Sequence, residues 1–256
     1  MRTKTPAFFL AGDSTTARVS IDGGGWGDGF LAIARRGGAE GRNFAVNGTT
    51  TVTFVTHGHW AELLETVQQH RDTHSVIVTI QFGHNDQKPT ANISPGQFVA
   101  NLEALIGQVR AAGGTPVLVS SLCRRNWTTS ETSAEKEKEN EGRIVRDLLD
   151  VTVGMKEAAR RAQCHLVDLN QASMDYCACI GPAKAHSYNL YPYDTTHLNA
   201  EGGVVFGVLM AQLLCWQFPE LGQYVQPDAD VVRAINEGVY IWPDTGNGGQ
   251  EAAAES

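Results

Sequence analysis

The feature that most constrains this chain is the alternation of short apolar runs with amphipathic segments. The apolar runs are typical of strands buried on both faces of a sheet. We expect these strands at residues 7–11, 42–46, 75–82, 115–121 and 164–169. Helical spacing predicts helices at residues 30–36, 60–71, 95–111, 135–162, 200–216 and 228–240. Strands that alternate with helices predict an α/β protein with a parallel sheet covered on both faces.

The length of 256 residues fits one large domain with one hydrophobic core. We find no internal repeat and no second domain, and we expect a single domain over residues 1–242. Residues 243–256 are rich in Gly, Ala and Glu, which predicts a disordered tail. The charge run at residues 135–141 is interpreted as the solvated face of a helix and not as a binding patch.

Composition excludes several classes of partner. The chain is 42% hydrophobic and 19% charged, as in ordinary globular proteins, and its net charge is -8. An acidic protein is a poor match for nucleic acid or an anionic membrane, so we expect neither as a partner. No apolar run approaches the roughly 18 residues that a membrane span needs. The five cysteines match no zinc spacing, so no metal site is predicted from them.

The first residues leave the compartment open. Arg2 and Lys4 precede a short apolar run that faintly imitates an export signal. The run is too short for that role and continues directly into the first predicted strand. We therefore interpret it as a strand, and expect either a cytoplasmic protein or a mature secreted form. Nothing in the sequence predicts an oligomeric state.

The first strand ends abruptly in Gly12-Asp13-Ser14-Thr15. The glycine indicates a sharp turn, which leaves Ser14 at the carboxyl end of a central strand. Open α/β sheets bind their ligands at this edge, so Ser14 is a candidate nucleophile. The alternative is that Asp13 or Ser14 caps the next helix, as these residue types often do.

Other strand ends and helix starts carry the remaining groups that acyl transfer needs. Ser14 would attack the carbonyl carbon, and His197, before the last long helix, would take its proton. Asp194 would orient the imidazole through its other nitrogen. The backbone N–H groups of Ser14 and Gly48 and the side-chain amide of Asn85 would donate to the oxyanion.

Each of these residues also has a purely structural interpretation. Gly48 suits a turn, Asn85 suits a turn or cap, and Asp194 suits a cap. His197 suits an exposed surface position. Taken together, the complementary chemistry at four separate element ends favours a catalytic site.

These blocks resemble the SGNH (GDSL-type) hydrolase family, and specifically its rhamnogalacturonan acetylesterase branch. The matching segments, in the family's order, are Gly12–Thr15, Gly48, Gly83–Asp86 and Asp194–His197. The resemblance extends from about residue 6 to residue 217. It implies a flavodoxin-like three-layer α/β/α sandwich with a five-stranded parallel sheet, a Ser-His-Asp triad and a three-donor oxyanion hole. It also implies no metal and no cofactor, and a supporting role for Asp13.

The chain departs from that branch after the second block. The branch tends to carry an arginine and a serine after the glycine, where this chain has Thr49 and Thr50. The loop after the fourth strand and the helix at 135–162 need not match a characterised member either. The resemblance therefore supports the core chemistry better than it supports a particular substrate.

Candidate substrate-binding residues come from aromatic and basic side chains near the predicted site. Arg124 and Arg125 would provide a locally positive rim for an acidic polysaccharide. Trp127, Trp26 or Tyr188 would stack on a sugar ring, with ordinary packing as the alternative for each.

The leading hypothesis is a serine esterase that removes acetyl or other short acyl groups from carbohydrate hydroxyls. A broad-specificity esterase, lipase or thioesterase on small acyl esters is the alternative within enzymes. A non-catalytic carbohydrate-binding protein on the same fold is a different class, and the intact Ser14, His197 and Asp194 argue against it. A metal hydrolase using His57, His59 and His84 lacks clear carboxylate partners.

Overall fold

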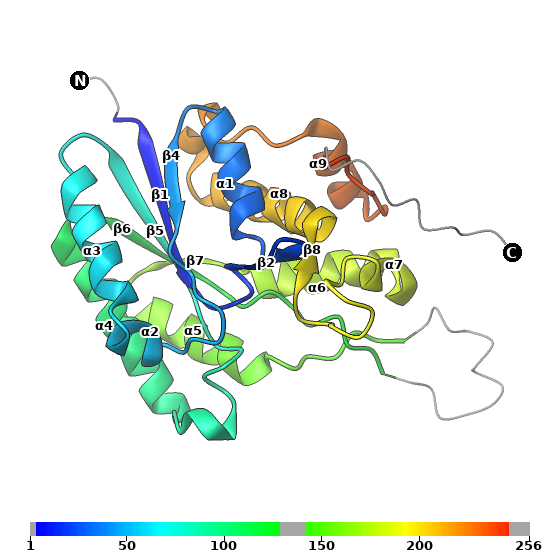
Figure 1. The fold of residues 1–256 in the computed structure, drawn as a ribbon, viewed down its shortest axis with the longest axis horizontal. Helices are drawn as coiled ribbons and strands as arrows, with labels where there is room; N and C mark the ends of the chain where they lie inside the picture. Colours follow the sequence, from blue (N-terminus) through cyan, green and yellow to red (C-terminus); the bar gives the residue numbers. More distant parts are fainter. Residues whose placement is uncertain (1–3, 129–141, 246–256) are drawn as a thin grey trace, which may run out of the picture.

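A five-stranded parallel sheet forms the centre of the protein, with helices on both faces (Figure 1). The computed structural model describes residues 4–128 and 142–245. The sheet strands are β1 (Pro6–Gly12), β4 (Glu40–Asn43), β5 (Ser75–Gln81), β6 (Thr115–Val119) and β7 (His165–Val167). Their order is β4-β1-β5-β6-β7, the flavodoxin-like order, so the expected α/β fold is confirmed. The order reverses between β1 and β5, whose carboxyl ends border the crevice where such sheets bind ligands.

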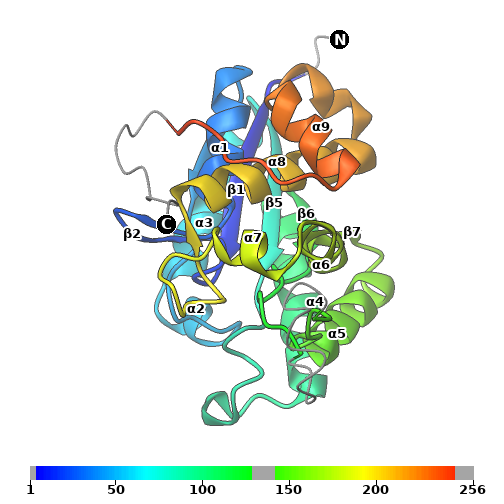
Figure 2. The ribbon, with the colours of Figure 1, turned by 90° about the vertical axis from the view of Figure 1, so that its right-hand side faces the viewer.

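Alternate side chains of β1 pack into two separate hydrophobic cores, because successive side chains of a strand point to opposite faces of the sheet. Phe8 and Leu10 belong to one core, and Ala7, Phe9 and Ala11 belong to the other. The first core includes residues of α1 (Gly27–Arg36), α6 (Leu169–Ile180), α7 (Pro182–His186), α8 (Ala200–Gln217) and α9 (Ala229–Glu237). The second includes residues of α2 (Thr53–Thr56), α3 (His59–His70), α4 (Pro95–Ala112) and α5 (Leu149–Arg161). The two sets of helices form the outer layers of the sandwich (Figure 2).

The second predicted strand lies earlier in the chain than expected, at Glu40–Asn43 instead of residues 42–46. The discrepancy is small in physical terms, because the chain continues to bond to β1 beyond Asn43. Phe44 N–H donates to Leu10 O at 2.8 Å, and Val46 N–H donates to Gly12 O at 3.0 Å. This contact carries the chain along β1 to the turn that contains Gly48.

A small antiparallel sheet joins two distant parts of the chain, and the sequence did not predict it. It consists of β2 (Arg18–Ser20), β3 (Gly23–Gly24) and β8 (Leu198–Asn199). Gly23 pairs with Asn199 and Gly24 with Leu198. The segment after Ser14 is thereby tied to the segment after His197.

The predicted helix at residues 135–162 is wrong over residues 142–148. Residues 142–148 are not helical, and α5 begins at Leu149. Trp127 instead pairs with Ile144 in an isolated antiparallel bridge. Hydrogen bonds between residues 126–128 and 143–145 replace helical ones here, with Thr128 N–H donating to Arg143 O at 2.9 Å and Val145 N–H to Asn126 O at 2.8 Å.

Two further expectations fall outside the described residues, wholly or in part. The charge run at 135–141 lies wholly outside them, and the predicted tail at 243–256 lies outside them from residue 246. Residues 243–245 form neither helix nor strand, and Thr245 Oγ1 donates to Glu201 Oε1 at 3.3 Å. The single domain over residues 1–242 stays a prediction.

Helix α8 is long and apolar enough to span a membrane, although no such run was predicted. Half of it is buried within the protein, and Val205, Phe206 and Met210 are completely inaccessible. A core helix meets the same length and composition criteria as a membrane span. The burial of α8 against α1 and the sheet accounts for its apolar character.

Candidate active site

The turn after β1 holds Ser14 at the carboxyl edge of the sheet. Thr16 and Ala17 N–H both donate to Asp13 O, at 3.1 and 2.9 Å, and close one helical turn. A side chain at Gly12 would place its Cβ 2.6 Å from Thr16 Oγ1 and 2.8 Å from Gln81 O. This position therefore requires glycine because of the close approach of the neighbouring strand. Ser14 itself is 5% exposed.

Gln81, the last residue of β5, anchors this turn from the neighbouring strand. Its Oε1 accepts hydrogen bonds from Thr16 Oγ1 at 2.5 Å and Trp26 Nε1 at 2.9 Å, and it lies 3.1 Å from Thr15 Oγ1. Its Nε2 donates to Ser120 O at 3.2 Å. All of these groups are buried, where an unmet donor would be costly. The sequence alone did not indicate Gln81, because an isolated glutamine at a strand end carries no pattern.

Ser14, His197 and Asp194 form a continuous hydrogen-bonded chain. Ser14 Oγ lies 2.8 Å from His197 Nε2, and His197 Nδ1 lies 2.8 Å from Asp194 Oδ2. Each distance is within the range of a strong hydrogen bond. The arrangement has the geometry of a nucleophile, a general base and an orienting carboxylate.

Asp194 is held in its ionised form by the loop that it caps. Its Oδ1 accepts from Thr196 N–H at 3.0 Å and from His197 N–H at 2.9 Å. Partial burial raises the pKa of the Asp194 carboxyl, but the hydrogen bonds from His197 and Thr196 outweigh it and leave that pKa below its ordinary value. An ionised Asp194 accepts a hydrogen bond from Nδ1–H of His197, which leaves Nε2 to accept a proton from Ser14.

The three predicted oxyanion donors lie on neighbouring segments. Gly48 has a φ of +78°, a conformation that favours glycine. Among the described residues, the N–H groups of Ser14 and Gly48 donate to no protein acceptor. Asn85 Nδ2 donates to Thr49 O at 3.0 Å, which uses one of its two hydrogens and keeps the amide beside the Gly48 turn. Lys88 Nζ donates to Asn85 Oδ1 at 2.7 Å and so fixes which end of the amide is the donor.

Asp13 and His84 form a buried pair next to the turn that holds Ser14. Asp13 Oδ1 accepts from Thr15 N–H at 2.9 Å and Thr15 Oγ1 at 2.8 Å, while Oδ2 lies 3.8 Å from His84 Nδ1. Burial lowers the pKa of the His84 imidazole to about 3, with the charge of Arg124 acting in the same direction. Burial also raises the pKa of Asp13, against the hydrogen bonds from Thr15. His84 is therefore neutral at physiological pH.

Two of the predicted sugar-stacking residues are inaccessible, and this part of the prediction is wrong. Tyr188 and Trp26 are both 0% exposed. Tyr188 OH donates to Ile241 O, and Trp26 is bonded to Gln81. Both rings therefore belong to the core. Trp127 and Arg124 are half-buried in the loop after β6, and their proposed contact with substrate stays a prediction.

Arg125 was predicted to lie on a positively charged rim of the site, and this prediction is also wrong. Its side chain is completely buried, and its guanidinium group points to backbone carbonyls of the loop that carries His197. Accessible aromatic side chains occur instead at Tyr191 and Tyr193, just before Asp194, at 54% and 98% exposure. The sequence gave no sign of their exposure.

The metal-hydrolase alternative gains no support. His84 contacts Asp13 and Thr15, whereas the rings of His57 and His59 lie near the short helix α2 with their centroids 6.3 Å apart. No three His, Cys, Asp or Glu side chains gather as a metal site would need within residues 4–128 and 142–245.

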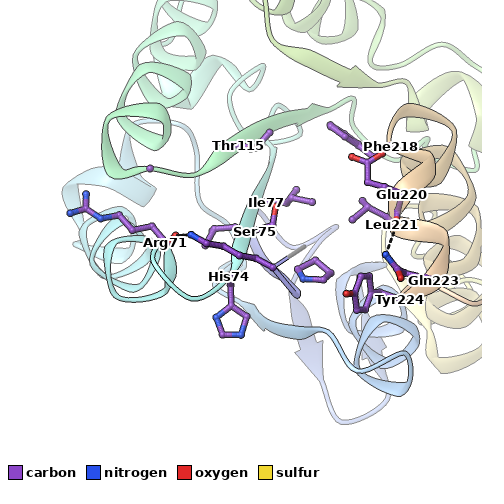
Figure 3. A pocket seen from close by; sticks show the side chains of 14 residues that line it. Arg71, His74, Ser75, Ile77, Thr115, Phe218, Glu220, Leu221, Gln223 and Tyr224 are labelled. Atoms are coloured by element: carbon purple, nitrogen blue, oxygen red, sulfur yellow. Dashed lines mark hydrogen bonds between the residues drawn. The ribbon is translucent and has the colours of Figure 1, made fainter. Parts of the chain in front are cut away.

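A separate pocket of about 500 Å³ opens at the opposite edge of the sheet (Figure 3). Pro6, Ser75 and Thr115, which line it, are the first residues of β1, β5 and β6. Lys4, Arg71, His74 and Tyr224 are among its other lining residues. Since the hydrogen-bonded serine, histidine and aspartate lie at the carboxyl ends, this pocket is not part of the candidate active site.

Comparison with known proteins is consistent with this geometry. The sequence model of the GDSL-like Lipase/Acylhydrolase family matches residues 10–203. The chain is 28% identical over 227 residues to rhamnogalacturonan acetylesterase RhgT of Bacillus subtilis, covering 83% of this chain and 90% of the relative. It is 27% identical over 232 residues to a rhamnogalacturonan acetylesterase of Emericella nidulans, covering 81% and 84%.

Among solved structures, the crystal structure of protein YXIM of Bacillus subtilis superimposes with a TM-score of 0.68 at 23% sequence identity. The match covers 84% of this chain but only 57% of that protein, so this chain spans little more than half of its length. At this level of identity the likeness concerns the fold alone.

Proposed function

The chain belongs to the GDSL-like lipase/acylhydrolase family and is a carboxylic ester hydrolase, and we propose that it removes acetyl groups from carbohydrate hydroxyls by a Ser-His-Asp mechanism. The single observation that carries the mechanism is the chain of two 2.8 Å contacts from Ser14 Oγ through His197 to Asp194. Ser14, His197 and Asp194 are the proposed catalytic residues.

In the acylation half of the reaction, Ser14 Oγ attacks the ester carbonyl carbon while His197 Nε2 takes the hydroxyl proton. Asp194 stabilises the resulting imidazolium through the Nδ1 hydrogen bond. Collapse of the tetrahedral intermediate breaks the bond to the sugar oxygen, and His197 returns the proton to that oxygen. The products of this half are the free sugar hydroxyl and an acyl group on Ser14.

Deacylation repeats these steps with water in place of the serine. His197 takes a proton from the water, whose oxygen attacks the acyl carbon, and the proton passes to Ser14 Oγ as the acid leaves. In both halves the negative charge on the carbonyl oxygen is stabilised by the N–H groups of Ser14 and Gly48 and by Asn85 Nδ2. These three donors need no reorganisation, because the turns and Lys88 hold them in place.

The carbohydrate substrate is proposed from the relatives, two of which are named as rhamnogalacturonan acetylesterases. The match covers 90% and 84% of these two relatives, which supports a shared type of substrate. Tyr191 and Tyr193 suit this class of substrate, because exposed aromatic rings offer apolar faces on which sugar rings pack. Trp127 and Arg124 are retained as candidates for substrate contact.

The test is acetate release from acetylated pectin and acetylated xylan, beside hydrolysis of 4-nitrophenyl esters of increasing chain length. We expect acetate from a polysaccharide and falling activity from acetyl to longer esters. The Ser14→Ala variant should lose both activities with an unchanged melting temperature. Activity that rises with chain length, without acetate release from polysaccharide, would favour a broad-specificity esterase of small acyl esters. Full activity in Ser14→Ala would refute the catalytic assignment.

A further inference from the structure

The catalytic loop at residues 194–197 is neither helix nor strand, so regular structure does not fix the position of His197. The N–H groups of Thr196 and His197 donate hydrogen bonds to the Asp194 carboxylate. The carbonyl oxygens of the loop need other partners, and a displaced loop would move His197 Nε2 away from Ser14. What holds the carbonyl side of this loop therefore bears on catalysis.

One residue, Arg125, contacts most of these carbonyl groups. Its guanidinium Nη2 donates to His197 O at 2.6 Å and makes a longer contact of 3.5 Å with Asp194 O. Its backbone N–H donates to Thr195 O at 2.9 Å. His197 O also accepts from Leu190 N–H at 3.0 Å. Three of the four carbonyl groups in the Asp194–His197 segment thus face donors of Arg125.

Arg125 is itself held by residues on the far side. Its Nε donates to Asn189 Oδ1 at 2.6 Å, and its carbonyl oxygen accepts from His186 Nε2 at 2.7 Å. Asn189 N–H in turn donates to His186 O at 2.9 Å. The guanidinium therefore bridges the segment that follows α7 and the catalytic loop.

The burial of this charge is not explained by an ion pair. Arg125 is 0% exposed, and among the described residues it forms no salt bridge. A buried cation is expensive unless hydrogen bonds replace its hydration. Nη1 has no protein partner within the described part of the chain. The hydrogen bonds of Nε and Nη2 are therefore the ones that replace the hydration of the guanidinium. Displacement of the catalytic loop would break the hydrogen bonds of Nη2 and leave this group buried without a partner. The free-energy cost of that loss favours the observed position of the loop.

We propose that Arg125 is a positioning residue for the general base, holding the loop so that His197 bridges Ser14 and Asp194. This inference rests on the proposed function. It predicts a defect in the chemical step, since misplacement of a catalytic group by about 1 Å lowers rates by about 100-fold. Binding of a small ester should change little, because Arg125 is inaccessible to it.

The test compares Arg125→Met and Arg125→Lys with Arg233→Met, an exposed arginine on α9 that serves as a matched control. With 4-nitrophenyl acetate, we expect kcat of Arg125→Met to fall by about 100-fold with KM within about twofold. Arg125→Lys keeps the charge and one donor direction and should recover part of kcat. Arg233→Met should match the wild type.

A spectroscopic measurement separates positioning from general destabilisation. The proton between His197 Nδ1 and Asp194 Oδ2 should give a downfield proton NMR signal in the wild type and in Ser14→Ala. That signal should be lost or broadened when Arg125→Met is added to either background. If Arg125→Met does not fold, Arg125→Lys carries the same comparison.

Two results would overturn the role of Arg125. One is a folded variant with wild-type kcat, and the other is a lost kcat with the downfield signal unchanged. The Ser14→Ala background keeps this test distinct from the proposed function. Full activity in Ser14→Ala would refute the mechanism, whereas persistence of the signal without Arg125 would refute only the positioning role.

Discussion

Lys88 Nζ donates a hydrogen bond of 2.7 Å to Asn85 Oδ1, and this contact decides which end of the Asn85 amide faces the proposed oxyanion site. An amide turned by 180° would present an oxygen where the mechanism needs an N–H. Thr49 O, 3.0 Å from Asn85 Nδ2, supports the same orientation from the other side. The two contacts together leave one N–H of Asn85 available for substrate.

Loss of this contact should reduce turnover moderately. We expect Lys88→Met to lower kcat by about fivefold, equivalent to about 1 kcal/mol, because Thr49 still favours the correct orientation. KM for 4-nitrophenyl acetate should stay within about twofold. Lys156→Met, on α5, removes a comparably exposed lysine that pairs with Asp168 and should keep the wild-type kcat. Equal rates for wild type and Lys88→Met would show that Lys88 does not orient Asn85.

The substitution Asp194→Asn should reverse the hydrogen bonding of His197. The new side-chain amide would donate to Nδ1 of the imidazole, which places the ring proton on Nε2, facing Ser14. Because His197 could no longer take the serine proton, we expect kcat to fall by about 10⁴-fold in a folded protein. Asp230→Asn, at an exposed site on α9, is the matched control. A loss of less than tenfold in Asp194→Asn would contradict the orienting role.

The pH dependence of stability should report the buried His84. The pKa of His84 is 6.5 for the ordinary group and about 3 in the folded protein, because burial disfavours the charged form. Between these values the unfolded chain binds one more proton at this residue than the folded chain does. Stability should therefore fall as the pH falls from about 6.5, by at most about 1.4 kcal/mol per pH unit from this group.

Urea denaturation of wild type and His84→Asn at several pH values between about 6.5 and about 4.5 isolates this contribution. The free energy of unfolding should fall less steeply with decreasing pH in the variant. Asp13, whose pKa is raised by burial, acts in the opposite direction, but it is present in both proteins. Parallel stability curves would show that His84 titrates normally in the folded protein.

The sequence predicted those parts of the fold in which local pattern and tertiary environment agree. Strands β1 and β5 and helices α4 and α8 lie within one or two residues of their expected bounds. Helix α6 was not predicted, because its buried face includes Asn170 and Ser173, which interrupt the apolar periodicity. The sheet of β2, β3 and β8 escaped prediction because β3 and β8 lie far apart in the chain, and pairing at such a separation has no local signal.

In the candidate site too, the sequence predicted the features that have a local pattern and missed those that depend on tertiary contacts. The residue types of Ser14, Asp194 and His197 were recognisable at element ends, whereas their 2.8 Å contacts depend on the tertiary fold. Exposure was the weakest part of the prediction. Tyr188 and Arg125 carry side chains that suit a substrate-binding rim, but both are buried, since packing around α8 and the catalytic loop decides their environment.

Gly25, in the glycine-rich segment before α1, lies against the turn that holds Ser14, and we expect that it cannot be replaced by a larger residue. A Cβ at Gly25 would lie 2.0 Å from Thr15 O, a backbone atom that cannot move without displacing Ser14. We expect Gly25→Ala to destabilise the protein by about 3 kcal/mol, to lower Tm by roughly 8 °C and to reduce kcat. Gly107→Ala is the matched control. No atom lies within 4 Å of a Cβ added at Gly107. Alanine also has a higher helix propensity than glycine at an exposed position inside a helix. Thermal denaturation should show Tm unchanged or slightly raised in Gly107→Ala, and an equally stable, fully active Gly25→Ala would refute the close-approach argument.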